Sequence, residues 1–484
     1  MRIAARLTLA FVTVTSLVLP RAFGQNLPDL GGLADGALPA RLEQRIGAEI
    51  MRDIRLREPS YLDDAEITEY LNVIGGRLVA ASPDVRQSFE FFAIRDSSMN
   101  AFALPGGYIG VHTGLLTAVD SESELASVLA HEVAHVTQRH IARLIGAQQQ
   151  MQIPTMVALA AALLLGRSRP DLAIGAAAAV QAGAVQSQIN YTRTFEREAD
   201  RIGFQTLSKA GFDAHAMAGM FEKMQRAGRV RDDGTVPSYL RTHPVDTERI
   251  ADAQNRAATQ PYKQVLDSAD FHFVRAGLRA ARGDARESVA SFTALLRDGR
   301  YARESAARFG LVQAHLRARQ TAEAAAELAR LRALKEASPM IDMLAAAVQR
   351  ASGDARAAIA TLEAARARHP QYRPALYALV EGLLEAGRGV EALAALEEPA
   401  RRHRGDARLA RLKAKTYATL GRRLLQHQAQ AEAYAIEGSL VAAIDQLQSA
   451  RAAADGDFYQ LSEVDARLRE LRALHAQELK DAKP

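Results

Sequence analysis

A repeat of about 34 residues governs what the C-terminal half of this 484-residue chain can fold into. Turn-forming dipeptides begin at Gly283, Arg319, Gly353 and Gly387, so that successive turns lie 36, 34 and 34 residues apart. Five residues after each turn stands a small residue, and four residues further on stands a large apolar one. These pairs are Ser288 and Phe292, Ala324 and Leu328, Ala358 and Leu362, and Ala392 and Leu396. Residues four apart share a helix face, so this spacing lets two helices pack closely.

The period of the repeat predicts its fold. A helix pair repeated every 34 residues is typical of the tetratricopeptide repeat, and such units stack side by side into a superhelix. We therefore predict an α-superhelix over residues 267–484. A nonrepetitive helical bundle is the alternative, and the four phased turns argue against it.

The repeat is disturbed near its C-terminal end. The next turn in phase falls at Gly421, where glutamines replace both the small and the large residue. The pattern resumes after Gly438, with Ala443 and Leu447 in the expected places. We expect the roughly 17 residues between these glycines to lengthen the helix before Gly438, and a terminal helix to follow over residues 461–479.

The composition limits the classes of function. The chain is 48% hydrophobic and 24% charged, which is enough apolar material to build cores. It has no cysteine, so disulfides, thiolate metal sites and cysteine nucleophiles are excluded. The net charge of +5 is spread among acidic residues without a concentrated basic patch, so no nucleic-acid partner is expected.

The N-terminus has the pattern of a secretory signal peptide. Two early arginines precede the uncharged run Leu7–Leu19, and small residues follow before Gln25. This apolar run of 13 residues is short for a membrane span, which needs about 20 residues. We predict a cleaved signal peptide over residues 1–24, a loose segment over residues 25–40 and a periplasmic mature protein. An uncleaved membrane anchor is the alternative.

The sequence HEVAH at residues 131–135 carries the most specific chemistry. His131 and His135 are four residues apart, so both imidazoles can project from one helix face to one zinc ion. The intervening Glu132 can take a proton from the attacking water. Apolar residues at helical spacing predict a buried helix over residues 121–145, where unliganded histidines would be costly. Two surface histidines on an ordinary helix are the alternative.

A catalytic zinc also needs a third protein ligand. His140 stands five residues after His135, about 140° further round a continuous helix, which makes it a poor ligand. The metzincin arrangement needs glycine at 138 and histidine at 141, but the chain has Gln138 and Ile141. An acidic residue on a second helix is the other solution.

Residues 191–200 supply such an acidic residue. Glu196 and Asp200 are four residues apart and share a helix face, whereas Glu198 points away from it. We predict that Glu196 is the third zinc ligand and that Asp200 accepts a hydrogen bond from a ligating imidazole. Glu198 is expected to be solvated. A charged helix face without a metal is the alternative.

These motifs resemble one peptidase family. HEVAH followed by the E-x-x-A-D pattern from Glu196 is similar to the zinc site of the gluzincin family of the CAAX prenyl endopeptidases and the heat-shock membrane protease. Residues 100–108, NAFALPGGY, resemble the strand before the zinc helix of that family. Residues 243–249, HPVDTER, resemble its downstream His-Pro…Arg element. The resemblance covers about residues 40–480.

The resemblance implies a mainly α chain, in which an α+β zincin-like metalloprotease domain over residues 41–266 precedes the tetratricopeptide superhelix. Apolar runs over residues 89–94 and from Tyr108 are the expected strands. The strand after Gly107 can pair with an extended substrate peptide. Asn100 is expected to orient that strand or to contact substrate, or else to form a turn.

His243 precedes a proline and is therefore expected on a loop. Near an open zinc site it could donate a hydrogen bond to the developing oxyanion, or act as a latch that fills the fourth zinc position. It could also only cap the helix expected over residues 247–257. Arg249 could anchor this loop or help to bind the oxyanion.

Two apolar segments, residues 156–166 and 172–185, lie between the zinc motifs. Each is too short to span a bilayer. We expect core helices, with peripheral contact to a membrane surface as the alternative.

For a secreted family member with tetratricopeptide repeats, the resemblance implies an endopeptidase with one zinc ion per chain. Its substrates would be unfolded or misassembled outer-membrane barrel proteins, and its partner the barrel assembly machinery. A chaperone or scaffold with a latent protease domain is a second interpretation. An intramembrane protease is a third, and the short apolar segments oppose it.

Overall fold

The computed structural model describes residues 38–147, 192–229, 243–261 and 263–481. The expected signal peptide and the two apolar segments at residues 156–166 and 172–185 lie outside these ranges. Within the described part of the chain, no helix combines the length and the apolar character that crossing a membrane requires.

The N-terminal part contains a four-stranded sheet with the order β1-β2-β4-β3. Its strands are β1 (Tyr61–Leu62), β2 (Glu90–Ile94), β3 (Ala101–Leu104) and β4 (Tyr108–His112). β2 and β4 are parallel, and each outer strand pairs antiparallel with its neighbour. The strands expected over residues 89–94 and from Tyr108 are confirmed. β1 was not expected, because a two-residue strand leaves no alternation in the sequence.

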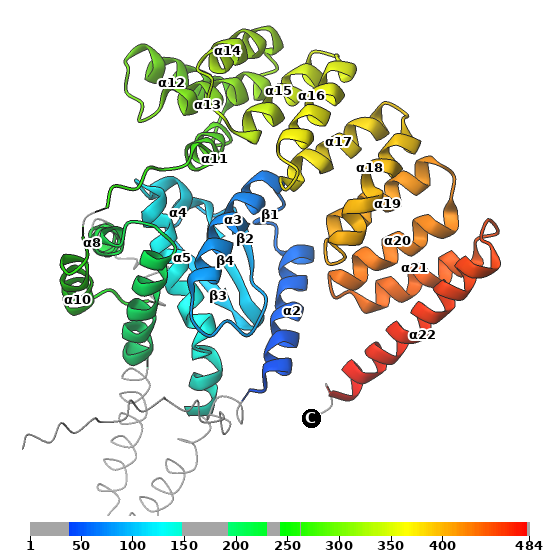
Figure 1. Cartoon of the computed structure of the whole chain (residues 1–484), viewed down its shortest axis with the longest axis horizontal. Coiled ribbons are helices and arrows are strands. Elements are labelled where there is room, and N and C mark those ends of the chain that lie inside the picture. Colours follow the sequence, from blue (N-terminus) through cyan, green and yellow to red (C-terminus); the bar gives the residue numbers. More distant parts are fainter. Residues whose placement is uncertain (1–37, 148–191, 230–242, 262, 482–484) are drawn as a thin grey trace, which may run out of the picture.

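Helices cover both faces of this sheet (Figure 1). They are α2 (Ala40–Arg57), α3 (Ala65–Ala81), α4 (Thr113–Ala118), α5 (Glu122–Thr137), two helices over residues 140–147 and 192–209, α8 (His215–Arg229) and α10 (Thr247–Ala258), with a short 3-10 turn η1 (Pro105–Gly107). Met51 of α2 packs on Phe92 and Ile94 on one face. On the other face Phe91 and Ile109 join a core with α3 and α5. Because β2 is covered on both faces, its sequence is a continuous apolar run.

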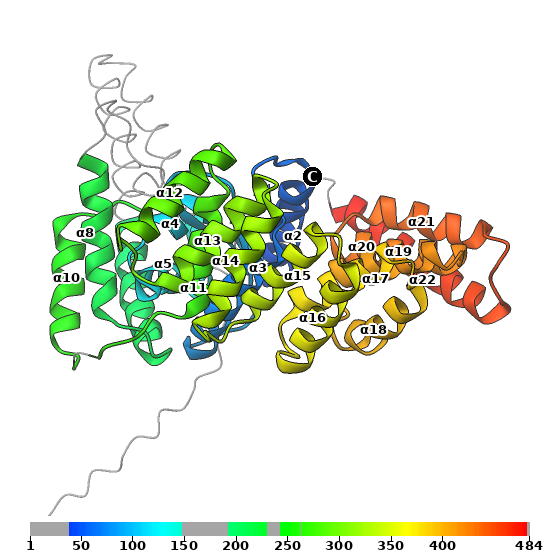
Figure 2. The ribbon, with the colours of Figure 1, turned by 90° about the horizontal axis from the view of Figure 1, so that it is seen from above.

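Paired helices make up the rest of the chain and form an arc that runs from above the sheet to beyond α2 (Figures 1 and 2). They are α11 (Ala269–Ala280), α12 (Ala285–Arg297), α13 (Glu304–Arg317), α14 (Thr321–Ala333), α15 (Pro339–Ala351), α16 (Ala355–Arg368), α17 (Arg373–Glu385), α18 (Gly389–Arg402), α19 (Ala407–Thr419), α20 (Arg423–Ile436), α21 (Leu440–Ala452) and α22 (Phe458–Asp481). The predicted helical repeat and its terminal helix are confirmed.

The predicted turns join the two helices of each pair. Gly283, Gly353 and Gly387 have positive φ angles of 61°, 82° and 71°, which glycine adopts without steric cost. Arg319 takes the same place with φ 59°. The small and the large residue after each of these turns are all buried.

The expected insertion before Gly438 is wrong. Gly421, with φ 70°, still forms a turn, and α20 is an ordinary helix of 14 residues between two turns. The sequence loses the small and large residues at Gln426 and Gln430, which are half-buried, but the turn glycine keeps the helix pair. The extra residues therefore make one further helix rather than a longer one.

The superhelix and the sheet-containing part share one hydrophobic core. Phe271 and Phe273 of α11 belong to the same buried cluster as Leu71 of α3 and Leu125 of α5. The expected boundary at residue 267 is therefore a boundary in sequence pattern and not in packing.

Polar contacts also join α2 and α3 to the superhelix. The Tyr372 hydroxyl donates to Glu66 at 3.1 Å, and Arg373 forms an ion pair with Glu69 at 3.0 Å. Further along the arc, Arg52 of α2 donates to the carbonyl of Gly438 at 2.9 Å. The displaced turn at Gly438 therefore contacts the sheet-containing part directly.

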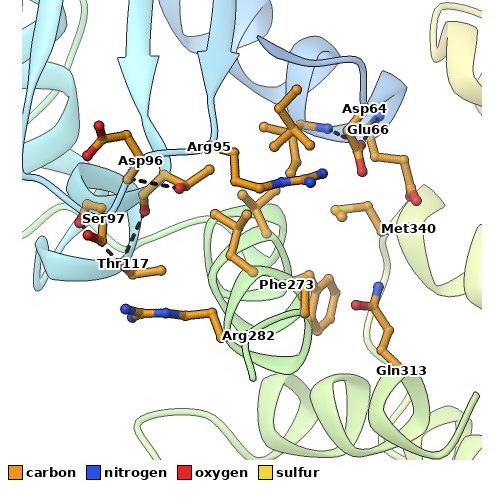
Figure 3. A pocket seen from close by; sticks show the side chains of 18 residues that line it. Asp64, Glu66, Arg95, Asp96, Ser97, Thr117, Phe273, Arg282, Gln313 and Met340 are labelled. Atoms are coloured by element: carbon orange, nitrogen blue, oxygen red, sulfur yellow. Dashed lines mark hydrogen bonds between the residues drawn. The ribbon is translucent and has the colours of Figure 1, made fainter. Parts of the chain in front are cut away.

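A cavity of about 600 Å³ separates the two parts between these contacts (Figure 3). Arg95 and Asp96, at the end of β2, line one wall, and Phe273 and Arg282 line the opposite wall. Glu66 also lines this cavity. The two parts therefore touch around an opening and not over one continuous surface.

The repeat pattern predicts unequal costs at equivalent positions. Leu396 and Gln430 each stand nine residues after a turn glycine, but Leu396 is fully buried and Gln430 is half-buried. Leu396→Ala should lower the free energy of unfolding by about 2–5 kcal/mol because it leaves a cavity. Gln430→Ala should change it by less than about 0.5 kcal/mol. Urea unfolding followed by circular dichroism measures both, and equal losses would contradict the repeat alignment.

Glu66 predicts a pH dependence of stability. Burial, reinforced by the charge of Asp64, raises the pKa of Glu66 to about 8, although the hydrogen bond from Tyr372 opposes this. The ordinary pKa is 4.5, so between these values the folded chain holds a proton that the unfolded chain releases. Stability from this group is present below about pH 4.5 and is lost as the pH rises through about 8.

Glu66→Gln should therefore flatten the fall of the thermal unfolding midpoint between these pH values, relative to the unmodified protein. Glu49→Gln, at an exposed position on α2, is the matched control. An identical pH profile for the Glu66→Gln variant and the unmodified protein would show that the carboxyl titrates normally.

Candidate metal centre

α5 brings the HEVAH motif into the core. Ser121 caps the helix by accepting a hydrogen bond from a backbone N–H of the first turn. Leu125 and Leu129 are fully buried and fix the face that packs inward. As a result, His131 is fully buried and Glu132 is 1% exposed. Polar groups this deep need partners within the protein or a bound ion.

Four metal-binding side chains meet at this point. His131 and His135 come from α5, Glu196 from the helix over residues 192–209, and His243 from the loop before α10. One ligand atom of each lies within 4.8 Å of the others, a cluster identified among the described residues. The Nε2 atoms of His131 and His135 are 2.9 Å apart, and they lie 3.4 and 3.3 Å from the carboxylate of Glu196. His243 Nδ1 lies 3.0 Å from that carboxylate and 3.3 Å from His131 Nε2.

Asp200 and Arg249 hold this cluster together. Asp200 Oδ1 lies 2.9 Å from His131 Nδ1. Arg249 donates to both oxygens of Asp200 at 2.7 Å, and its Nη1 lies 2.9 Å from Glu196 Oε2. The same guanidinium donates to the carbonyl of Pro244 at 2.7 Å, next to His243. Arg249 thus ties the His243 loop to the helix that carries Glu196. Asp246, not His243, caps α10, so the expectation of a capping histidine is wrong.

The protons of the cluster leave its centre rich in acceptors. Because Asp200 is hydrogen-bonded to His131 Nδ1, that nitrogen carries the proton, and Nε2 turns a lone pair inward. Both carboxylate oxygens of Glu132 are buried and accept no hydrogen bond from any residue that the structure describes. Acceptors at these separations repel one another unless a cation lies among them. Imidazole nitrogens and one carboxylate form a donor set that fits a metal ion such as zinc.

The pKa shifts of the cluster follow from burial and from these contacts. Burial disfavours the charged ring of His131, but the hydrogen bonds to Asp200 and Glu196 outweigh it and raise the pKa to about 10. Burial opposes the charged forms of Glu196 and Asp200 too, yet hydrogen bonds from His131 and other donors lower the pKa of both carboxyls. Burial and the neighbouring His131 lower the pKa of His135. The two carboxylates are therefore ionised and ready to hold a cation.

The expected continuous helix over residues 121–145 is broken after α5. Arg139 has a positive φ of 53°, and a second helix covers residues 140–147. The angle that we derived for His140 from a continuous helix is therefore wrong. His140 nevertheless stays outside the four converging ligands, and burial and the neighbouring His135 lower its pKa to about 2. Its ring lies behind His135, with the two Nδ1 atoms 2.9 Å apart.

Glu198 is not solvated as expected, because its side chain is only 23% exposed. It lies 3.4 Å from His140 Nε2 and accepts a hydrogen bond from Arg143 at 2.9 Å. Sequence reasoning missed this contact, since it depends on the helix break that turns His140 towards Glu198.

The expected substrate strand is also wrong. β4, which begins at Tyr108, pairs with β2 on one side and with β3 on the other, so its backbone has no free edge. The outer strand next to it is β3, which packs against α5. Asn100 directly precedes β3, and its side-chain oxygen is buried without a hydrogen-bond partner among the described residues. Gly107 has a structural role, because a Cβ there would lie 2.2 Å from the carbonyl oxygen of Ser88.

Several known proteins are similar to this chain. A Vibrio cholerae protein provisionally named beta-barrel assembly-enhancing protease is 44% identical over 277 residues, or 56% of each chain. The beta-barrel assembly-enhancing protease of Escherichia coli K12 is 34% identical over 453 residues, which cover 93% of this chain and 92% of that one. The mitochondrial metalloendopeptidase OMA1 of Schizosaccharomyces pombe is 32% identical over 212 residues, 43% of this chain and 58% of that one.

A buried His-His-Glu centre on two helices beside a small sheet, followed by a helical repeat, defines a metallopeptidase with a tetratricopeptide superhelix. The pattern of peptidase family M48 matches residues 66–257, and that of the tetratricopeptide repeat matches residues 349–416. The chain belongs to peptidase family M48 and, within it, to the family of the beta-barrel assembly-enhancing proteases.

The ligand assignment predicts a difference between two neighbouring acids. Glu196→Ala should lower metal affinity by about a hundredfold or more, because it removes one of the converging donors. Glu198→Ala should still bind one metal ion per chain at stoichiometric concentrations. Metal content after gel filtration, measured by inductively coupled plasma mass spectrometry, separates the two. Loss of metal from the Glu198 variant with retention in the Glu196 variant would reverse the assignment.

Proposed function

We propose that this protein is a zinc-dependent endopeptidase of the periplasm that degrades unfolded or misassembled outer-membrane barrel proteins. The convergence of His131, His135 and Glu196 at one buried point is the observation that carries the proposal. The names of the full-length relatives support the substrate class, and the signal-peptide pattern at residues 1–24 supports the location. The barrel assembly machinery is the proposed partner.

In this proposal His131, His135 and Glu196 hold the zinc ion and Asp200 orients His131. When bound, zinc polarises the scissile carbonyl and makes water a stronger nucleophile near neutral pH. Glu132 takes the proton of the attacking water and returns it to the leaving amine. The buried, unpaired oxygens of Glu132 support this role, since no described residue competes for them.

The outer strand β3 is the proposed template for the substrate backbone. An extended peptide can add to a free sheet edge through main-chain hydrogen bonds. β3 lies against α5, which carries His131 and Glu132. Asn100, at the start of this edge, has a buried side-chain oxygen without a partner among the described residues, and this supports a contact to the substrate backbone.

His243 is the proposed latch of the resting enzyme. Its Nδ1 lies among the donor atoms of the other three ligands, where a fourth donor would exclude the substrate carbonyl and water. Arg249 holds the loop in this position through Pro244 and Asp200. Release of the loop would open the site.

Glu132→Gln tests the proposed reaction directly. The variant should keep its zinc and lose cleavage of an unfolded protein by about a thousandfold or more, because the general base is removed. Peptide products are measured by mass spectrometry. Undiminished cleavage would exclude Glu132 as the base, and its loss together with zinc would show a folding defect. If the unmodified, zinc-loaded protein cleaves nothing, the chaperone interpretation replaces the enzyme.

His243→Ala distinguishes the latch from an oxyanion donor. As a latch, His243 blocks the site, so the variant should cleave an unfolded protein several-fold faster than the unmodified enzyme while keeping its zinc. As an oxyanion donor, the same residue would cost about a hundredfold in turnover when removed. Unchanged turnover would remove His243 from both roles.

A comparison of substrates tests the proposed client class. An unfolded outer-membrane barrel protein and an unfolded soluble protein of similar length are offered together at equal concentration. The proposal expects preferential cleavage of the barrel protein, and equal rates for both would contradict it.

A further inference from the structure

His135 has a neighbour that the proposed mechanism does not use. Its Nε2 faces the metal-binding cluster, whereas its Nδ1 lies 2.9 Å from His140 Nδ1 on the other side of the ring. His140 is 3% exposed and stacks on Phe195, with ring centroids 4.6 Å apart and 15° between the planes. This contact exists only because the chain breaks its helix at Arg139, a non-glycine residue with positive φ.

The direction of the hydrogen bond follows from the metal site. A histidine binds a metal through a nitrogen that carries no proton, so a ligating His135 has its proton on Nδ1. That proton is then donated to His140 Nδ1. The proton of His140 therefore sits on Nε2, which is the atom that faces Glu198 at 3.4 Å.

The chain ends in a fixed charge pair. Arg143 donates to the same oxygen of Glu198 at 2.9 Å, and its guanidinium lies 4.7 Å from the centre of the Phe195 ring. The side of Phe195 thus packs against both His140 and Arg143. His140 has a stacked ring, an acceptor and a donor partner, which together leave it one orientation.

We propose that His140, oriented by Glu198, is a positioning residue that fixes His135 in the tautomer and orientation that bind the metal. The inference rests on the proposed zinc centre and adds residues outside its ligand set. His131 has comparable support from Asp200 and Arg249. Loss of such a hydrogen-bond partner typically weakens metal binding by about 10–100-fold, because the imidazole is free to rotate or to change tautomer.

Two substitutions at His140 separate positioning from packing. His140→Phe keeps a ring that can stack on Phe195 but has no acceptor for the Nδ1–H of His135. His140→Asn loses the ring but places an amide oxygen near the former Nδ1. Zinc affinity is measured by competition with a chromophoric chelator at one fixed pH, on the full chain, and the unfolding midpoint of each metal-free variant is recorded.

Positioning predicts about 10–100-fold weaker zinc binding for His140→Phe and a smaller loss for His140→Asn. A role in packing alone predicts the reverse order, with His140→Phe close to the unmodified protein, and that result or equal affinities would overturn the inference. Absence of zinc binding in the unmodified protein would instead contradict the proposed function itself.

Glu198→Ala gives a second test should His140→Phe not fold. It should weaken zinc binding several-fold without removing a ligand, whereas Glu248→Ala, which removes an exposed acid paired with Arg197, should leave zinc affinity unchanged. Identical affinities for these two variants would also overturn the inference.

Discussion

The close approach of two helices is the constraint on which the whole metal centre depends. A Cβ at Gly203 would lie 3.1 Å from the carbonyl oxygen of Ala130, so only glycine lets the helix over residues 192–209 come this near to α5 without a shift. Ala134 and Ala199, both fully buried, fill the contact next to the ligands. Larger side chains here would separate the acidic ligand from the histidines. The small residues are therefore as necessary to the site as the groups that bind.

Charge balance explains why so many ionisable groups can be buried together. Each acid that supports an imidazole is itself paired with an arginine: Asp200 with Arg249, and Glu198 with Arg143. Burying an unpaired carboxylate would cost several kcal/mol, of order, whereas a bidentate arginine pair offsets much of that cost. The pairs also transmit position, because a guanidinium that donates two hydrogen bonds leaves the carboxylate little freedom. The imidazoles are thus oriented from outside, by groups that do not touch the metal themselves.

The sequence predicted what depends on spacing along one helix and missed what depends on distant contacts. The pairing of His131 with His135, the repeat turns and the choice of Glu196 all follow from residues a few positions apart. The helix break at Arg139 does not, because it is held by a hydrogen bond to the carbonyl of Leu38 and by an ion pair with Glu43. The free edge of β3 was missed for a similar reason, since strand order is set by pairing and not by local pattern. At Gly421 the backbone kept a turn although the side-chain pattern was lost.

Arg249 has a thermodynamic consequence. It bonds to the loop carbonyl of Pro244, to Asp200 and to Glu196, so the position of the His243 loop and the geometry of the metal ligands are not independent. Two equilibria that share a residue in this way are linked, and each must shift the other by the same factor. A loop that leaves the site loosens the grip on the ion, and an ion that leaves weakens closure. The resting form is then also the form that retains its metal best, which suits a protein in a compartment where the supply of metal varies.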